Sequence, residues 1–436
     1  MTVNAEQYRR RRADLMAMMG PGSIAILPAA GEAVRNRDVL YPYRQDSDFY
    51  YLSGFAEPES VLVLAPGGAR GECVLFCRER DPAKAIWDGE RAGQDGAIND
   101  YGADDAFSID DIDEQLPAMI EGCGKVYCTL GENPAFDAQL LGWIERLRQR
   151  ARAGVRAPSE FVALEHLLHE MRLFKSRAEI GVMRKAASIA AQAHTHAMRI
   201  CKPGMTEYQL EADLLYTFHR HRAVAAYGSI VGGGANGCVL HYVDNAQPLR
   251  DGDLVLIDAG AEYAYYASDI TRTFPVNGRF SQPQRAVYDC VLAAQQAAID
   301  AARPGCTWND PHTAAVRVLT QGMIDLGLLS GTVEHCIDNG AYRRFYMHRT
   351  GHWLGMDVHD VGDYQVDGQW RELEPGMVFT VEPGLYITPA EDVDERFWNI
   401  GVRIEDDVLI TRDGCEVLTG EVVKSADDIE RLMAQG

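Results

Sequence analysis

In the first part of the chain, short apolar runs alternate with longer stretches of helical periodicity. Residues 61–65 and 73–77 are continuous apolar runs of strand length, whereas residues 136–150 carry apolar positions with the period of a helix. Strands that alternate with helices are typical of α/β domains. The pattern therefore predicts an N-terminal α/β domain over residues 1–172.

A long helix is predicted directly after this domain. Ser176 is followed three residues later by Glu179, the spacing of a capping box. The helical pattern ends at Pro203 and Gly204, which cannot continue it. Between these limits one stripe of apolar residues recurs at helical spacing: Ile180, Met183, Ala187 and Ala190. The second domain, residues 173–436, is expected to begin with this helix.

The same pattern recurs about a hundred residues later. Ser281 and Gln284 repeat the capping box, Pro304 ends the second Ala-rich helix, and Thr307 stands after it as Thr206 does after the first. This repetition indicates an internal duplication, although Pro-Gly is also common directly after helices in general. Two related halves around a pseudo-twofold axis are therefore expected.

Each half then places acidic residues at the ends of strand-like segments. The apolar run 254–257 leads into Asp258, and the run 378–381 leads into Glu382. Asp269 begins an alternating segment whose distance from Asp258 suits a hairpin. A buried carboxylate needs a cation, a positive side chain or backbone donors. Taken alone, any one of these acids could instead be a residue that forms a turn or caps a helix.

Arg403 and Glu405 belong to a further alternating segment, which places them on one face. Two interpretations of this pair are open. Arg403 could neutralise Glu405 in a buried ion pair, or it could orient a ligand carboxylate or a substrate.

Histidines are concentrated in the segment 348–360. His348, His352 and His359 fall within it, and His241 stands apart from them earlier in the chain. His348 and His352 have the spacing of a helical zinc pair, but the glycines of the segment and the missing glutamate disfavour a metalloprotease helix. Four histidines in these settings exceed what packing requires.

These residues together could hold two divalent cations. Four carboxylates would balance the charge of two such ions, and an oxygen-rich set with one imidazole suits manganese, with cobalt or zinc as alternatives. The candidate ligands are Asp258, Asp269, His352, Glu382 and Glu405. The natural interpretation is a hydrolase that uses two metal ions.

Composition narrows the class of protein. With 436 residues and 47% hydrophobic composition, the chain is long enough for two cores, and its net charge of −22 disfavours nucleic acid or an anionic membrane as the main partner. The ten cysteines include no CxxC pair and are expected to be reduced, as in the cytosol. No apolar run is long enough to span a bilayer, and the start of the chain lacks a signal peptide's apolar core. We therefore expect a soluble cytoplasmic protein.

A run of arginines at positions 9–12 is the main basic feature near the N-terminus. We interpret it as the solvated face of an amphipathic first helix, with Leu15 and Met16 facing inward, rather than as a binding arm.

These motifs resemble those of the Xaa-Pro aminopeptidase (aminopeptidase P) family in the pita-bread metallopeptidase superfamily, which also contains prolidase, methionine aminopeptidase and creatinase. The segment 348–360 matches the family's proline-peptidase signature, and the likeness extends to residues 43–51, so it covers nearly the whole chain. The five candidate ligands fall on the family's ligand positions: Asp258 in IDAG, Asp269 in SDITRTF, His352, Glu382 in VEPG and Glu405 in RIEDD. The implied fold class is α/β (α+β), with a creatinase-like N-terminal α/β domain before a pita-bread catalytic domain.

The resemblance also implies roles for the site residues. Asp258 and Asp269 would share one ion, His352 and Glu382 would complete the shell of the other, and Glu405 would bridge both. A hydroxide between the metals would attack the Xaa-Pro amide, with Glu382 as the proton shuttle. The further catalytic residues implied are His359, His241 and Arg403.

Substrates of the family carry proline at the second position, so their scissile amide has no N–H and must be recognised by shape. His348, Tyr386 and Arg403 match family positions near the proline pocket. Trp87 matches a tryptophan contributed by a neighbouring subunit, with ordinary domain packing as the alternative. The expected partners are peptide substrates and further copies of the chain, as a homodimer or homotetramer built through the N-terminal domain.

Two other functions stay open. A prolidase would use the same metals on Xaa-Pro dipeptides, and a metal-free pita-bread module would bind peptides without cleaving them. Creatinase chemistry is disfavoured because all five ligand residues are present, and methionine aminopeptidase is disfavoured by the long N-terminal domain.

Overall fold

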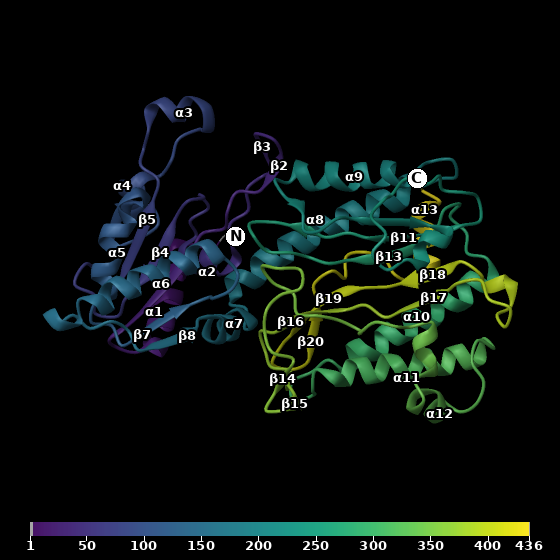
Figure 1. Ribbon diagram of the computed structural model, residues 1–436. Coiled ribbons are helices and arrows are strands. Elements are labelled where there is room, and N and C mark those ends of the chain that lie inside the picture. The colour runs from purple at the N-terminus through teal and green to yellow at the C-terminus, as the bar shows by residue number, and fades with distance from the viewer. Residues whose placement is uncertain (1–2, 436) are drawn as a thin grey trace. The chain divides into compact units, whose positions relative to one another are not determined.

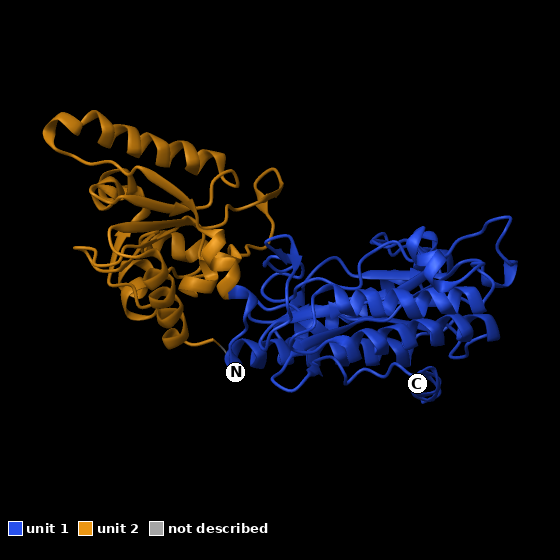
Figure 2. Ribbon diagram, turned by 90° about the horizontal axis from the view of Figure 1, so that it is seen from below, with its two compact units in different colours: residues 1–2, 172–436 blue, residues 3–171 orange. Residues whose placement is uncertain are grey.

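The computed structural model describes residues 3–435, which form two compact units (Figure 2). The N-terminal unit comprises residues 3–171, and the C-terminal unit comprises the described chain from residue 172 onward. Each unit has its own hydrophobic core. Within residues 3–435, no helix combines the length and apolar character needed to cross a membrane.

A six-stranded mixed sheet forms the centre of the N-terminal unit (Figure 1). Its strands are β1 (Ser23–Pro28), β4 (Val61–Leu64), β5 (Cys73–Cys77), β6 (Asp105–Ser108), β7 (Lys125–Cys128) and β8 (Glu160–Ala163), and a separate hairpin consists of β2 (Val34–Asn36) and β3 (Val39–Leu40). The order is β6-β5-β4-β1-β7-β8, with β1 antiparallel to β4 and parallel to β7. The two apolar runs of the sequence are thus adjacent strands, β4 and β5, which pair antiparallel and are buried throughout.

The helices of this unit are α1 (Ala5–Met19), α2 (Ser47–Ser53), α3 (Pro82–Asp88), α4 (Gly93–Asn99), α5 (Ile112–Ile120), α6 (Pro134–Gln149) and α7 (Glu165–Leu173), which runs across the boundary of the two units. On α6, Trp143 is fully buried in the core, and its indole N–H donates to Asp113 Oδ1 at 2.6 Å. The predicted helix over residues 136–150 is confirmed.

The interpretation of the arginine run as a solvated face is wrong for two of its members. Arg11 and Arg12 are buried, and their guanidinium groups donate to the carbonyls of Tyr51 and Leu52 at 2.9 Å each. Those carbonyls belong to the last turn of α2, where a helix has no donors of its own. The two arginines therefore cap α2, and Leu15 is buried beside them as predicted.

Helices of the C-terminal unit pack in pairs, α8 (Arg177–Ile200) with α9 (Glu207–Arg220) and α10 (Gln282–Ala301) with α11 (Asn309–Asp325), followed by α12 (Val333–Asp338) and α13 (Ala426–Met433) (Figure 1). Both predicted capping boxes are present, Ser176 with Glu179 at α8 and Ser281 with Gln284 at α10. The repeated helix starts of the sequence are confirmed.

Two three-stranded antiparallel sheets carry the core of this unit, in the orders β10-β11-β13 and β16-β19-β20. They comprise β10 (Ile230–Gly233), β11 (Leu254–Asp258), β13 (Thr271–Pro275), β16 (Val378–Val381), β19 (Asp406–Ile410) and β20 (Cys415–Val417). Two-stranded pairs surround them: β9 (Val224–Ala225) with β12 (Ala261–Glu262), β14 (Gln365–Val366) with β15 (Gln369–Trp370), and β17 (Gly384–Ile387) with β18 (Ile400–Arg403). The β11/β13 pair follows the first helix pair in the chain and the β16/β19 pair follows the second, which is the order that a duplication predicts.

Candidate active site

In the first half, the pairing of β11 with β13 brings two carboxylates to one end of a sheet. Asp258 is the last residue of β11 and lies opposite Thr271, the first residue of β13. Asp269 precedes Thr271 by two residues, and neighbouring strands in a sheet are close together. Both acids are thereby held near one point.

The second half repeats this arrangement. Val381, the last residue of β16, lies opposite Asp406, the first residue of β19, and the acids Glu382 and Glu405 flank this pair in the chain. The backbone N–H of Glu405 donates to the carbonyl of Thr271 at 3.0 Å. This bond joins the two halves at the ends of the strands that carry the acids.

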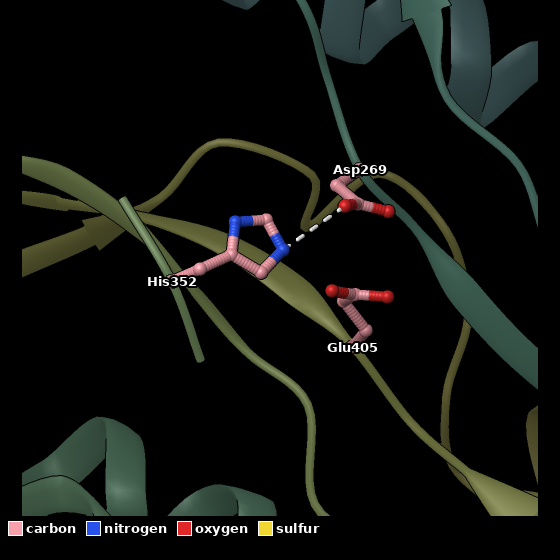
Figure 3. Close-up of side chains that lie close together, drawn as sticks. All are labelled: Asp269, His352 and Glu405. Carbon is pink, nitrogen blue, oxygen red and sulfur yellow. Dashed lines mark ion pairs between the residues drawn. The ribbon is translucent and has the colours of Figure 1, made fainter. Parts of the chain in front are cut away.

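Three of the predicted ligands converge tightly, as Figure 3 shows. One ligand atom from each of Asp269, His352 and Glu405 lies within 4.8 Å of the others. His352 Nε2 is 3.4 Å from Asp269 Oδ2 and 3.8 Å from an oxygen of Glu382. Glu382, a third acid, therefore lies beside the triad.

Asp258 is held by two neighbours rather than by the triad. The hydroxyl of Tyr227 contacts Asp258 Oδ1 at 2.6 Å and also contacts Asp269, while Arg403 Nη2 lies 2.5 Å from Asp258 Oδ2. Of the two interpretations of Arg403, the ion pair with Glu405 is wrong, because the guanidinium pairs with the carboxylate at the end of β11. Arg403 orients one of the predicted ligands.

Three acids of the cluster resist ionisation in the protein alone. Burial, with the charges of the neighbouring acids, raises the pKa of Asp269 and of Glu405, and it raises the pKa of Glu382 to about 7. Buried carboxylates that lack enough positive charge favour the protonated form. Divalent cations would supply that charge, so the donor set fits metal ions.

His352 is arranged as a metal ligand would be. Its Nδ1 lies 2.9 Å from the carbonyl of Trp353, which accepts a hydrogen bond from the Nδ1–H tautomer and leaves the lone pair of Nε2 directed at the acids. Burial opposes its charged form, yet the hydrogen bond to Asp269 and the charge of Glu382 raise the pKa of His352 to about 9. A bound cation would displace that proton.

A glycine is required next to this histidine. A Cβ on Gly351 would lie 1.9 Å from the carbonyl oxygen of Thr380, on the strand that leads to Glu382. The backbone bearing His352 can approach β16 only because position 351 has no side chain, and the bond from Thr380 N to His352 O, 3.0 Å long, completes the contact.

The predicted residues of the C-terminal unit share one cavity of about 460 Å³. Its lining includes Asp258, Asp269, His352, Glu382, Glu405, His359, His241, His348 and Arg403. Tyr386 is buried against it, and its hydroxyl lies 2.8 Å from His348 Nε2 and 3.0 Å from Arg403 Nη1. A larger cavity of about 780 Å³ lies among α10, α11 and α12, but it contains none of the predicted site residues.

Two of the histidines in the cavity are kept neutral. Burial and the charge of Arg403 lower the pKa of His348 to about 4, and burial and the charge of His352 lower the pKa of His359. Neutral imidazoles can both accept and donate hydrogen bonds, which suits contact with a peptide.

One predicted site residue lies outside this group. Trp87 is on α3 in the N-terminal unit, and 85% of its surface is exposed. It is not packed into the core of its own unit.

Sequence reasoning missed two residues that support the ligands. Tyr227 contacts two of them, and Thr271 Oγ1 donates to Glu405 Oε2 at 2.6 Å. Tyr227 lies in no motif, so only the folded chain reveals it. Thr271 stands two residues after Asp269 in the alternating segment, so the same alternation was a signal that could have found the threonine.

Two family models match the chain. Residues 181–412 match metallopeptidase family M24, and residues 8–127 match the aminopeptidase P N-terminal domain.

Known proteins match it nearly from end to end. Xaa-Pro aminopeptidase of Escherichia coli is 48% identical over 99% of this chain and 98% of its own length, and that of Haemophilus influenzae is 45% identical over 98% and 97%. The solved structure of Pseudomonas aeruginosa aminopeptidase PepP is 59% identical, with a TM-score of 0.99 over 100% of this chain and 99% of that one. Proline aminopeptidase P II from Yersinia pestis is 51% identical, with a TM-score of 0.96 over 100% of both chains. Since both the catalytic and the N-terminal regions match, this chain belongs to the aminopeptidase P family of the M24 metallopeptidases.

Proposed function

We propose that the protein, loaded with two divalent metal ions, removes the N-terminal residue from peptides that carry proline at the second position. The observation that supports this most directly is the convergence of Asp269, His352 and Glu405 in one cavity with the other acids and histidines. The end-to-end similarity to Xaa-Pro aminopeptidases supports the same activity.

The metal ions would be held by Asp258, Asp269, His352, Glu382 and Glu405. Four carboxylates with one imidazole favour manganese, with cobalt or zinc as alternatives that cellular supply would decide. Metal ions in such a site supply Lewis acidity toward the scissile carbonyl and lower the pKa of water.

Glu382 is the candidate proton shuttle. It lines the cavity beside the other candidate ligands, where a carboxylate can accept a proton from the attacking water and release it again. It would accept the proton of the attacking water and deliver it to the proline nitrogen as the amide breaks. Arg403 would hold Asp258 in place.

Two histidines would bind the reacting carbonyl. His241 and His359 both line the cavity, and imidazole N–H groups can donate to the oxygen that becomes negative during attack. His348 and Tyr386 form a hydrogen-bonded pair at the side of the cavity. We assign to that pair the recognition of the proline ring, which offers shape but no N–H.

Cleavage of a matched peptide pair tests this function. Chelator-stripped protein is assayed with an Xaa-Pro-Yaa tripeptide and the corresponding Xaa-Pro dipeptide, with and without manganese. We expect manganese-dependent release of Xaa from the tripeptide, much faster than from the dipeptide. Preference for the dipeptide would instead identify a prolidase, and cleavage of neither with any divalent ion would contradict the proposal.

We further propose that the enzyme is a cytoplasmic homodimer or homotetramer, assembled through the N-terminal domain over residues 1–172. The exposed Trp87 on α3 supports a contact with a neighbouring subunit, whose active site it would border. The ten free cysteines support a reducing compartment. Sedimentation of the protein and of a Trp87→Ala variant would test the assembly.

A further inference from the structure

The loop that carries His241 has little regular structure of its own. It connects β10 to β11, and residues 234–247 of it, called here the His241 loop, begin with a single 3-10 turn, Gly234–Cys238. Val239 and Val243, on either side of the histidine, are 51% and 57% exposed. Burial of apolar side chains therefore contributes only part of what holds the histidine in the cavity.

A single buried carboxylate contacts this loop along its length. Glu207, the first residue of α9, is fully buried. Its Oε1 accepts from Gly233 N at 2.8 Å and from Asn236 Nδ2 at 2.9 Å. Its Oε2 accepts from the hydroxyl of Tyr242 at 2.8 Å and from Gln247 N at 2.7 Å. The carboxylate thus joins the end of β10, the 3-10 turn, the neighbour of His241 and the end of the loop.

These four bonds are stronger than those of a neutral anchor would be. An ionised carboxylate accepts charge-assisted hydrogen bonds, and its place in the first turn of α9 adds the favourable field of a helix N-terminus. The backbone strengthens the connection, since Glu207 N donates to Gln247 O at 3.0 Å. Both oxygens are fully used, so the group binds the loop rather than an outside ligand.

We infer that Glu207 is a positioning residue for catalysis: it fixes the His241 loop so that His241 stands in the active-site cavity at the reacting carbonyl. Tyr242 is the direct connection, because its hydroxyl is held by Glu207 while its chain neighbour lines the cavity. This inference rests on the proposed role of His241.

Substitution by glutamine separates this role from simple folding. Glu207→Gln keeps the size of the side chain, but its amide nitrogen is a donor and cannot accept from the two groups that face it. The hydrogen bond from Thr206 N to Gln209 Oε1 at the start of α9, 2.9 Å long, is left in place. Glu211→Gln, one turn further along α9, is the matched control, because among the described residues Glu211 makes no hydrogen bond to the loop.

A double-mutant cycle with His241→Ala gives the decisive measurement. We expect His241→Ala to lower kcat/KM on the tripeptide by about 100-fold or more, as loss of an oxyanion donor does. We expect Glu207→Gln to lower it by about tenfold, with little added loss in the double variant, because residues that act as a unit are not additive. Manganese content and the activity of Glu211→Gln should match those of the unaltered protein.

Hydrogen exchange of the metal-free protein provides a readout that does not depend on activity. Glu207→Gln should speed exchange in residues 234–247 and leave α8 unchanged. If Glu207→Gln does not fold, Tyr242→Phe replaces it in the cycle. We expect Tyr242→Phe to lower kcat/KM by less than Glu207→Gln, and this loss should again not be additive with that of His241→Ala.

The possible failures are distinguishable. If His241→Ala retains full activity, the proposed role of that histidine is wrong. If His241→Ala is impaired but the loop variant is not, or if the two losses multiply in full, Glu207 does not act through His241.

Discussion

Two groups of buried carboxylates in the C-terminal unit differ in where their counter-charge comes from. Asp406 and Asp360 are buried in ion pairs with cationic side chains, whereas Glu405 is buried mainly beside other acids and Glu382 lies among acids and His352. The two groups are close in the chain, since Asp406 directly follows Glu405. The contrast distinguishes acids that stabilise the fold through ion pairs from acids whose charge the protein leaves uncompensated.

The structural acids are fully compensated by the chain itself. Asp406 lies 2.7 Å from Arg272 and 2.8 Å from Lys424, and these charges overcome burial and lower its pKa to about 2. Asp360 likewise lies 2.6 Å from Arg172 and 2.9 Å from Lys175. Asp406 joins β19 to β13 through Arg272. Asp360 joins the histidine-rich segment 348–360 to the start of the C-terminal unit.

The acids of the site have the opposite balance. Arg403 pairs with Asp258, and burial, together with repulsion from neighbouring acids, raises the pKa of both Glu382 and Glu405. Among the described residues, the imidazole of His352 is the cationic group inside the cluster of the metal-free protein, and its single charge faces several acids. This difference is what a site that binds a metal would require, because a bound cation would supply the missing positive charge.

Replacing a ligand should give the largest effect. Glu405→Gln keeps the acceptor for Thr271 but removes one charge from the cluster. We expect the metal content to fall and kcat/KM to drop by about a thousandfold or more, since the charge that stabilises the transition state is lost. Metal analysis and peptide kinetics would measure both. Unchanged metal content in this variant would remove Glu405 from the ligand set.

Removing a structural acid should instead damage the fold. Asp406→Ala leaves Arg272 buried without its partner, so the metal-free protein should lose about 3–5 kcal/mol of unfolding free energy in urea. The control is Arg184→Ala, which breaks the surface pair with Glu416 and should have little effect. Equal losses in the two variants would abolish the distinction between the groups.

The hydroxyl of Tyr227 lies between the site acids and should have an intermediate effect. Tyr227→Phe removes its contacts with Asp258 and Asp269 while keeping the ring. We expect metal affinity to weaken by about 10- to 100-fold, as for other residues that orient ligands. Titration of stripped protein with manganese would measure it, and an unaltered affinity would show that the two acids need no such support.

The contributions of the two groups of acids to the stability of the folded protein should depend on pH in opposite senses. In stripped protein the pKa of Glu382 is raised from 4.5 to about 7, so its contribution is present below pH 4.5 and is lost as pH rises through 7. Asp406, with its pKa lowered from 3.8 to about 2, contributes above pH 3.8 and loses this as pH falls through 2. We expect metal-free protein to lose about 1–3 kcal/mol between pH 5 and 8.

Added manganese and a Glu382→Gln variant should each flatten this slope. Urea unfolding at several pH values would measure it. A stability that rises over this range in the stripped protein would contradict the assignment of the raised pKa values to the site.

Much of the fold could be predicted because its signals are local. The capping boxes at Ser176 and Ser281 depend on residues three positions apart, and the apolar runs of β11 and β16 on continuous stretches. The expected fold class and the Xaa-Pro aminopeptidase family are confirmed by the comparisons. The roles of the individual site residues and the number of metal ions stay predictions.

The signals that were missed or misjudged are all contacts between distant segments. Arg11 and Arg12 were expected on a solvated face, but the carbonyls at the end of α2 need donors, and the chain meets that need from 40 residues away. Arg403 shares a strand face with Glu405 by alternation, yet its partner is Asp258 in the other half.

The sequence by itself determined which residues could do chemistry, where the long helices begin, and to which family the chain belongs. Only the tertiary structure decided how charge is distributed among them: that Arg403 neutralises Asp258, that Tyr227 lies between two ligands, and that Glu207 holds the loop of His241. The reason is physical. Residue type and local spacing are written along the chain, whereas burial, hydrogen-bond partners and pKa values depend on which distant groups folding brings within a few ångströms.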